Sequence, residues 1–267
     1  MLYGSTPRSR WRLLKSSDDR VRRDQRVVGL DHRGNARVRH ACPADRNGGE
    51  RWPPDPLRHD AVHSSALLTD TVFFGQQING AASFNPDLVY EQGRVTARDA
   101  LAAGVPWVFS PVLDISHNPL WPRTYETFGE DPHLTAVMGD AIVRGLQSNN
   151  QSAACFKHWI GYSWTDTGHD TDGVAISDFD LLNTFIPAFK AVIDAGALTG
   201  MENYISVNGV LVIENTKLMT KLLRDDVGFS GMMVTDFYEI NDLPAFFKFR
   251  RELFQRTLHY RAVQIRR

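Results

Sequence analysis

The chain has few cysteines, almost no net charge and no long apolar run, and each absence argues against a class of protein. Cys42 and Cys155 are its two cysteines, and they form neither a metal-ligand spacing nor a disulfide framework. No apolar run approaches the roughly 20 residues that a membrane span needs, and the residues after Met1 contain no apolar core of a signal peptide. The formal net charge of -1 gives no electrostatic reason to expect nucleic acid or an acidic membrane surface as a partner.

The sequence does contain enough apolar residues for a sizeable core, but they are unevenly distributed. The 267 residues are 42% hydrophobic, and a single α/β barrel typically has about 250 residues. Residues 1–58 hold thirteen arginines against the single lysine Lys15 and show little apolar periodicity, so this segment is predicted to be irregular. An arm that grips phosphate is the alternative, but acidic residues are mixed among the arginines and no interleaved aromatic residues support stacking on bases.

The middle of the chain alternates between helix and strand patterns. Asn85 and Pro86 are typical of a helix start and Gly104 of its end, and Asp131 and Pro132 begin a second helix in the same way. The predicted helices cover residues 85–104, 131–147, 178–196 and 215–228, and the apolar strands between and after them cover 105–115, 152–156, 197–201 and 231–235. This alternation predicts an α/β fold with a parallel sheet covered by helices.

Polar residues at the strand ends favour one kind of parallel sheet. Lys157 and His158 end one strand, Met201 and Glu202 end the next, and Asp236 follows the last. Polar chemistry gathered at the carboxyl ends of several strands is typical of a TIM-like (β/α)8 barrel. A doubly wound fold more often shows a glycine-rich phosphate turn after its first strand, and none is present.

Four long motifs carry a resemblance to a known family. They read "NPLWPRTYETFGEDPHL", "AACFKHWIGYS", "TGMENYISVNG" and "GFSGMMVTDFYEI". In this order and at these separations they closely resemble the N-terminal barrel of glycoside hydrolase family 3, especially its β-glucosidase branch. The resemblance runs from about Asp60 to Ile240. It implies a partial catalytic barrel over residues 59–245, preceded by the arginine-rich segment 1–58 and followed by an irregular or helical basic tail, 246–267.

Asp236 is the residue on which the implied chemistry depends. An aspartate after a strand often caps the next helix, but the resemblance implies that Asp236 is the catalytic nucleophile, which holds the sugar as a covalent ester. Phe237 matches the aromatic residue that follows the nucleophile. Arg123 matches an arginine that binds hydroxyls of the nonreducing-end glucose, and its planar fork suits paired oxygen acceptors. Without the motif, a surface ion pair would be the simpler interpretation of Arg123.

The other expected sugar contacts lie at earlier strand ends. Lys157 and His158 match an adjacent basic pair that donates hydrogen bonds to sugar hydroxyls, and a charge that closes an apolar strand needs a reason. Met201 and Tyr204 match walls of the glucose pocket, although such residues near a strand end are more often part of the core. Asp60 aligns without gaps with the family's glucose-binding aspartate, although Ser64 replaces the glycine of that motif and Arg58 and His59 replace apolar residues.

Two departures from the family pattern concern the ends of the chain. Family members with two domains supply the general-acid glutamate from a second α/β domain, and 31 residues follow Asp236, so the general acid is not expected in this chain. The first strand and the final strand and helix have no recognisable counterparts, so the barrel is predicted to be incomplete at both ends. We expect both arginine-rich ends to come from a defective gene model, which an in-frame transcript encoding them would contradict.

The resemblance therefore implies a retaining exo-acting β-glucosidase that hydrolyses terminal non-reducing β-D-glucosyl residues of glucans or glucosides. It implies no metal and no cofactor, and family members are often secreted or lysosomal. One alternative is an N-acetyl-β-hexosaminidase-type member that uses His169 as its acid, although Thr167 and Gly168 replace the usual Asp-Ser before that histidine. Another is a noncatalytic remnant that at most binds sugar or does not fold alone.

Overall fold

The computed structural model describes residues 29–30, 36–37, 57–66, 68–237 and 239–240, and the chain divides into two units. In the first unit, Met1–Ala44, β1 (Gly29–Leu30) pairs antiparallel with β2 (Ala36–Arg37). The second unit, Asp45–Arg267, holds the remaining described structure. Most of the arginine-rich segment, the whole predicted tail 246–267 and Cys42 lie outside the described residues.

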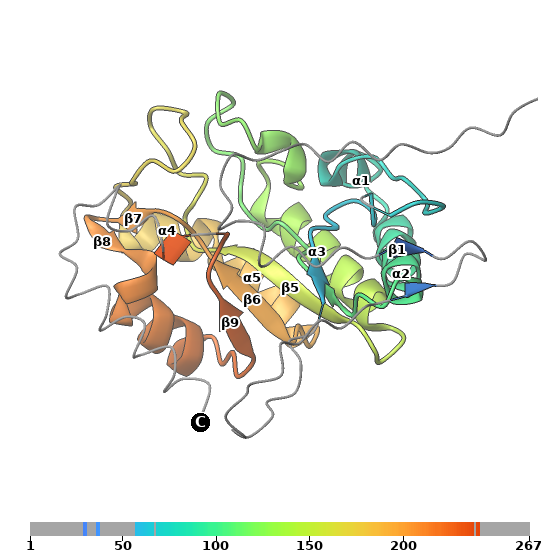
Figure 1. Ribbon diagram of the computed structural model, residues 1–267. Coiled ribbons are helices and arrows are strands. Elements are labelled where there is room, and N and C mark those ends of the chain that lie inside the picture. The colour runs from blue at the N-terminus through green and yellow to red at the C-terminus, as the bar shows by residue number, and fades with distance from the viewer. Residues whose placement is uncertain (1–28, 31–35, 38–56, 67, 238, 241–267) are drawn as a thin grey trace, which may run out of the picture. The chain divides into compact units, whose positions relative to one another are not determined.

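A parallel sheet of five strands forms the centre of the second unit (Figure 1). Across the sheet the strands are β3 (Arg58–His59), β4 (Trp107–Val108), β5 (Ala153–Trp159), β6 (Thr199–Glu202) and β9 (Met232–Val234). Every neighbouring pair is parallel, and the spatial order follows the chain order. A doubly wound sheet reverses its order partway across, so the order confirms a barrel-like arrangement. The described strands leave β3 and β9 as the two ends of the sheet, which agrees with the predicted incomplete barrel.

The first strand of this sheet lies where the sequence predicted no strand. Arg58 pairs with Trp107 and His59 pairs with Val108. Arg58 therefore belongs to the sheet, although the sequence pattern assigned it to the irregular segment. Polar side chains at positions 58 and 59 hide the strand from a hydrophobicity pattern, whereas backbone pairing with β4 does not depend on them.

The predicted helices form, with one break. Asn85 caps α2 (Pro86–Ala102) by accepting the backbone N–H of Asp87, and Asp131 caps α3 (Pro132–Gln147) by accepting two backbone N–H groups. The helix predicted over 178–196 is instead two helices, α4 (Asp178–Thr184) and α5 (Ile186–Asp194). Pro187 explains the break, because proline lacks the N–H that would continue the α4 hydrogen bonds and its ring excludes the carbonyl four residues before it.

The remaining elements are short or irregular. The helix predicted over 215–228 is present as a π-helix, η4 (Lys217–Asp226). These elements are α1 (Gln77–Ala82), η2 (Thr124–Glu126), β7 (Ser206–Val207), β8 (Val210–Leu211), η3 (Val212–Glu214) and η4 (Lys217–Asp226).

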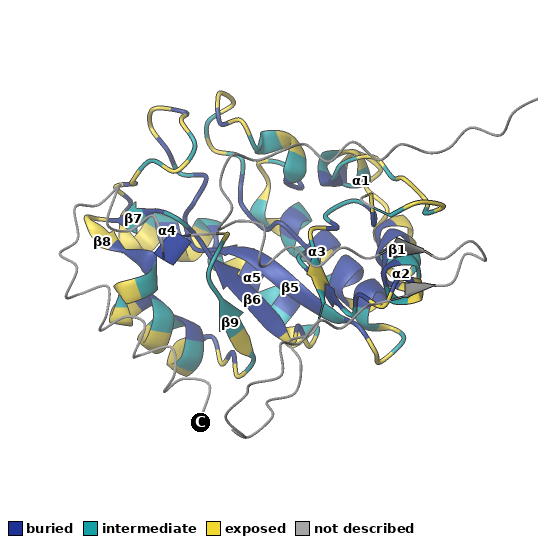
Figure 2. Ribbon diagram, in the orientation of Figure 1, coloured by how far each residue is buried: buried dark blue, intermediate teal, exposed yellow. Residues whose placement is uncertain are grey.

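Aromatic residues fill the core between the sheet and α5. The ring of Phe156 on β5 packs edge-on against Phe189 and Phe229, with centroids 5.7 and 5.0 Å away, and Trp159 packs against Phe189 at 5.0 Å. All four side chains are buried, and Figure 2 shows β5 and β6 almost wholly in the colour of buried residues. Helix α3 packs against β5 and between α2 and α5. The central strand β5, which carries Lys157 and His158, is therefore held by an apolar core.

Candidate active site

The carboxyl ends of the parallel strands bring polar side chains from distant parts of the chain together. Asp60 follows β3, Asp114 lies on the loop after β4, and Asp236 follows β9. Lys157 and His158 lie near the end of β5. Neighbouring parallel strands end at the same edge of a sheet, which is where barrel enzymes assemble their sites. Contacts among these five residues form what we call the carboxyl-end cluster.

Lys157 and Asp60 form the first contact of the cluster. The Lys157 Nζ atom donates to Asp60 Oδ1 at 2.5 Å, between residues 97 positions apart. The Lys157 side chain is 5% exposed and that of Asp60 is 65% exposed. A buried ammonium group needs a partner of opposite charge, and Asp60 provides it. Asp60 and Lys157, two of the predicted sugar-binding residues, are thus in direct contact.

His158 lies between two carboxyl groups. Its Nδ1 atom is 2.7 Å from Asp114 Oδ2, and its Nε2 atom is 3.5 Å from Asp236 Oδ2. The exposed fractions of the side chains are 1% for His158, 0% for Asp114 and 13% for Asp236. Burial lowers the pKa of His158 well below its usual value, and the positive charges of Arg123 and Lys157 lower it further. Burial also raises the pKa of Asp114 to about 8.

The adjacent side chains of Lys157 and His158 both reach the carboxyl-end cluster because β5 is irregular at this point. In a regular strand, successive side chains point to opposite faces. The register between β5 and β6 shifts between Phe156 and Trp159, the stretch that contains Lys157 and His158. Lys157 thus contacts Asp60 while His158 contacts Asp114 and Asp236.

The Asp236 carboxylate is partly buried and held by its own loop. The backbone N–H of Phe237 donates to Asp236 Oδ1 at 2.6 Å. Burial raises the pKa of Asp236 above its ordinary value, and this effect is opposed by the Phe237 N–H and by the charges of Lys157 and Arg123. Tyr204 fixes the same loop, because its hydroxyl donates to the carbonyl oxygen of Phe237 at 2.7 Å.

Arg123 is held next to the cluster by an acidic neighbour. Its Nε and Nη2 atoms donate to the two Glu126 carboxylate oxygens at 3.0 and 2.8 Å. Its guanidinium carbon lies 5.6 Å from the ring centroid of Tyr162, and that ring packs edge-on against His158 at 5.0 Å. Burial lowers the pKa of Arg123, but the Glu126 hydrogen bonds and charge outweigh it and leave the pKa raised. Arg123 is therefore charged and oriented, with one edge of its fork occupied by Glu126.

The remaining predicted residues differ in their surroundings. Met201 is 3% exposed and belongs to an apolar cluster with Trp107 and Cys155, which matches the core interpretation better than a pocket wall. Phe237 is 73% exposed. The side chain of His169 is 80% exposed, and its Nδ1 atom lies 3.6 Å from Asp172 Oδ2.

Three residues of the site were missed by sequence reasoning: Asp114, Glu126 and Tyr162. Asp114 offered a signal, because it is a single carboxylate inside the predicted apolar strand 105–115, where an unpaired charge is costly. Glu126 lies three residues after Arg123, which is a common spacing for ion pairs. Tyr162 offered none, because its contacts with Arg123 and Trp121 depend on the tertiary fold.

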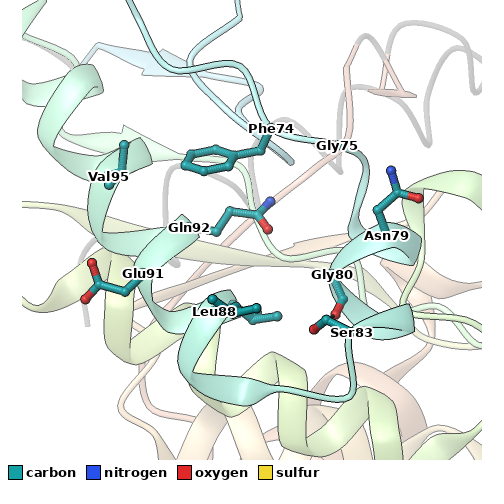
Figure 3. A pocket seen from close by; sticks show the side chains of 10 residues that line it. Phe74, Gly75, Asn79, Gly80, Ser83, Leu88, Glu91, Gln92 and Val95 are labelled. Carbon is teal, nitrogen blue, oxygen red and sulfur yellow. Dashed lines mark hydrogen bonds between the residues drawn. The ribbon is translucent and has the colours of Figure 1, made fainter.

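Other features of the described residues do not compete with this cluster. Figure 3 shows a hollow between α1 and α2 with Phe74, Leu88 and Gln92 around it. Its volume is about 340 Å³, and none of its lining residues belongs to the carboxyl-end cluster. Across the described ranges, no group of three or more His, Cys, Asp or Glu side chains could hold a metal ion. No helix in this part of the chain is long and apolar enough to cross a membrane.

Comparison with known proteins identifies a family and individual relatives of this chain. The family described as Glycosyl hydrolase family 3 N terminal domain matches residues 56–259. The lysosomal beta glucosidase of Dictyostelium discoideum is 39% identical over 198 residues, which are 70% of this chain and 24% of the relative. A beta-xylosidase of Formosa agariphila is 32% identical over 233 residues, covering 82% of this chain and 31% of the relative.

Solved structures of beta-glucosidases also resemble this chain. A beta-glucosidase from Listeria innocua in complex with isofagomine superposes with a TM-score of 0.67 at 29% identity, covering 71% of this chain and 27% of that one. A beta-glucosidase involved in saponin metabolism from intestinal bacteria gives a TM-score of 0.70 at 34% identity, with coverages of 73% and 26%. The chain thus spans about a quarter to a third of the length of the curated relatives described above.

Proposed function

Because the chain belongs to glycosyl hydrolase family 3, we propose that it is part of the catalytic domain of a retaining, exo-acting β-glucosidase. Its substrate is a terminal non-reducing β-D-glucosyl residue of a glucan or glucoside, and Asp236 is the nucleophile. The observation that carries the proposal is the position of the Asp236 carboxylate. It is 13% exposed, lies at a strand end and is 3.5 Å from His158.

In the proposed reaction, Asp236 attacks the anomeric carbon while the glycosidic bond to the leaving oxygen breaks. A general acid protonates that oxygen, and its conjugate base then removes a proton from the water that displaces Asp236 from the ester. The chemistry requires Asp236 to be ionised, and the cationic groups of Lys157 and Arg123 favour the ionised form. We propose that the acid comes from a second α/β domain outside residues 1–267.

The charged neighbours of Asp236 serve to hold the sugar in this proposal. The Lys157 ammonium group donates to sugar hydroxyls while Asp60 accepts from them, and their 2.5 Å contact places both groups at one position of the sheet edge. Arg123 contributes the part of its guanidinium group that Glu126 does not occupy. His158 faces the sugar through its Nε2 atom, since its Nδ1 atom is engaged by Asp114. Tyr204 and Phe237 border the same loop.

Glucose and xylose are the two sugars that the relatives leave open. Named relatives include both a beta glucosidase and a beta-xylosidase, and the two sugars differ by a hydroxymethyl group. We propose glucose because the most similar of these relatives and the solved structures above are beta-glucosidases. The hexosaminidase alternative receives no support from His169, whose side chain is 80% exposed and whose Nδ1 atom lies 3.6 Å from Asp172 Oδ2.

Covalent trapping of the nucleophile tests the proposal. Dinitrophenyl 2-deoxy-2-fluoro-β-glucoside has a leaving group that departs without a general acid, and the fluorine slows hydrolysis of the ester. Intact-mass spectrometry of the 267-residue chain should show one adduct, and peptide mapping should place it on Asp236. The variant Asp236→Asn keeps the side-chain size and should gain no adduct. An adduct that persists in this variant would refute the assignment, and labelling by the matched 2-deoxy-2-fluoro-xyloside alone would refute the choice of glucose.

A further inference from the structure

A neutral His158 ring has too few N–H groups to donate to both Asp114 and Asp236 if both carboxyl groups are ionised. A neutral imidazole has one N–H donor and one acceptor nitrogen. Nδ1 lies 2.7 Å from Asp114 Oδ2, and Nε2 lies 3.5 Å from Asp236 Oδ2. With both carboxyl groups ionised, the lone pair of one ring nitrogen would face a negative oxygen. An imidazolium ring would satisfy both, but it would place a further positive charge near Arg123 and Lys157, in a site where His158 is 1% exposed.

The surroundings of Asp114 favour the neutral form of its carboxyl group. The side chain is 0% exposed, and among the described residues Oδ1 has no hydrogen-bond partner. A buried carboxylate that leaves one oxygen unsatisfied is costly, whereas a neutral carboxyl group loses much less on burial. The raised pKa of Asp114, to about 8 through burial, points in the same direction. Groups on several elements act against this effect of burial: the charges of Arg123 and Lys157 and the backbone N–H of His158 favour the carboxylate of Asp114, whereas Glu126 opposes it.

We propose that Asp114 is a positioning residue that holds a proton, donates it to His158 Nδ1 and so makes Nε2–H of a neutral imidazole the donor that faces Asp236. Oδ2 of Asp114 still accepts the backbone N–H of His158 at 3.3 Å through its remaining lone pair. The protonation states of Asp114 and His158 do not depend on the proposed function, but their role in catalysis rests on it. In that reaction, Nε2–H donates to the nucleophilic carboxylate or to a sugar hydroxyl, and both tasks need a donor at this atom.

The tautomer of His158 tests the proposal without requiring activity. In the 267-residue chain labelled with ¹⁵N-histidine, NMR distinguishes a protonated from an unprotonated ring nitrogen, and His158→Gln identifies the signals. We expect a neutral ring protonated at Nε2 near pH 7. A ring protonated at Nδ1, or at both nitrogens, would overturn the proposal. This result stands apart from the glucosidase assignment, which fails separately if Asp236 is not labelled by the fluoroglucoside.

Two substitutions of Asp114 add a functional measurement. The amide nitrogen of Asp114→Asn can donate to Nδ1, so the Nε2–H tautomer should be retained. Protonation of the ring at Nδ1 in this variant would count against the proposal. Asp114→Ala removes the group that orients His158, and the rate of fluoroglucoside labelling should fall by about 10- to 100-fold, the scale of losing the hydrogen bond from Nε2–H to a charged carboxylate. The loss in Asp114→Asn should be smaller, and an equal loss in both variants would count against proton donation by Asp114.

Discussion

A methyl group added at Gly145 tests the packing that holds the helices behind the central strands. A Cβ atom at Gly145 would lie 2.1 Å from the backbone carbonyl oxygen of Tyr90 and 3.0 Å from the backbone nitrogen of Arg94. Real Cβ atoms essentially never approach closer than 3.0 Å, so α3 and α2 would have to separate by roughly 1 Å in a close-packed core. The contact is reciprocal, because a Cβ atom at Gly93 would lie 2.6 Å from the carbonyl oxygen of Ile142.

Two opposing effects decide the sign of the change in stability. Alanine favours a helix interior over glycine by about 1 kcal/mol, whereas overpacking a core costs about 1–3 kcal/mol or more. The obstacle at Gly145 is backbone, which cannot rotate away as a side chain can, so the cost lies at the upper end. We expect Gly145→Ala to lower the free energy of unfolding by about 1–2 kcal/mol.

Gly139 on the same helix provides the matched control. Its Cβ atom would meet buried side-chain atoms of Leu113 and Val192, each at 2.9 Å, and no backbone atom nearer than these. Because side chains yield more easily than backbone, Gly139→Ala should lower the free energy of unfolding by less than Gly145→Ala does. Urea unfolding of the 267-residue chain, followed by circular dichroism and tryptophan fluorescence, measures both variants. A Gly145→Ala variant as stable as the wild type, or more stable, would refute the packing argument.

Three further predictions concern the carboxyl-end cluster. Labelling of Asp236 by the fluoroglucoside should fall as the pH drops, because the attacking carboxylate is then protonated. Since burial raises the pKa of Asp236, the midpoint should lie above the value of about 3.9 for a free aspartate, and a midpoint at or below it would contradict the burial argument. Asp60→Asn leaves the buried Lys157 ammonium group without its counter-charge. Because Asp60 is 65% exposed, the free energy of unfolding in urea should fall by only about 1–2 kcal/mol. The control variant Asp60→Glu keeps the charge and should retain most of the stability. On dinitrophenyl β-glucoside, NMR should show β-glucose as the first-formed anomer, as a double displacement requires, and α-glucose first would exclude Asp236 as a nucleophile.

The sequence by itself determined the elements whose causes are local. Asn85 and Asp131 act as helix caps, as expected, because a cap needs only the backbone N–H groups two or three residues ahead. The alternation of apolar strands and helices determined the parallel sheet, since a strand buried on both faces must be apolar. The long motifs around Asp236 determined the family, which the match over residues 56–259 confirms. The break at Phe185 could also have been read from Pro187, whose effect is equally local.

Only the tertiary structure decided which side chains meet. The strand at Arg58 and His59 exists because β4 offers backbone partners, and no pattern in those two polar residues predicts it. Asp114 and His158 are 44 residues apart, and their contact depends on the parallel order of the sheet and on the irregular register at the end of β5. A carboxyl group is charged or neutral according to what surrounds it in space. The protonation of Asp114 therefore follows from burial and from neighbours that the fold supplies, because desolvation acts through distance and not through position along the chain.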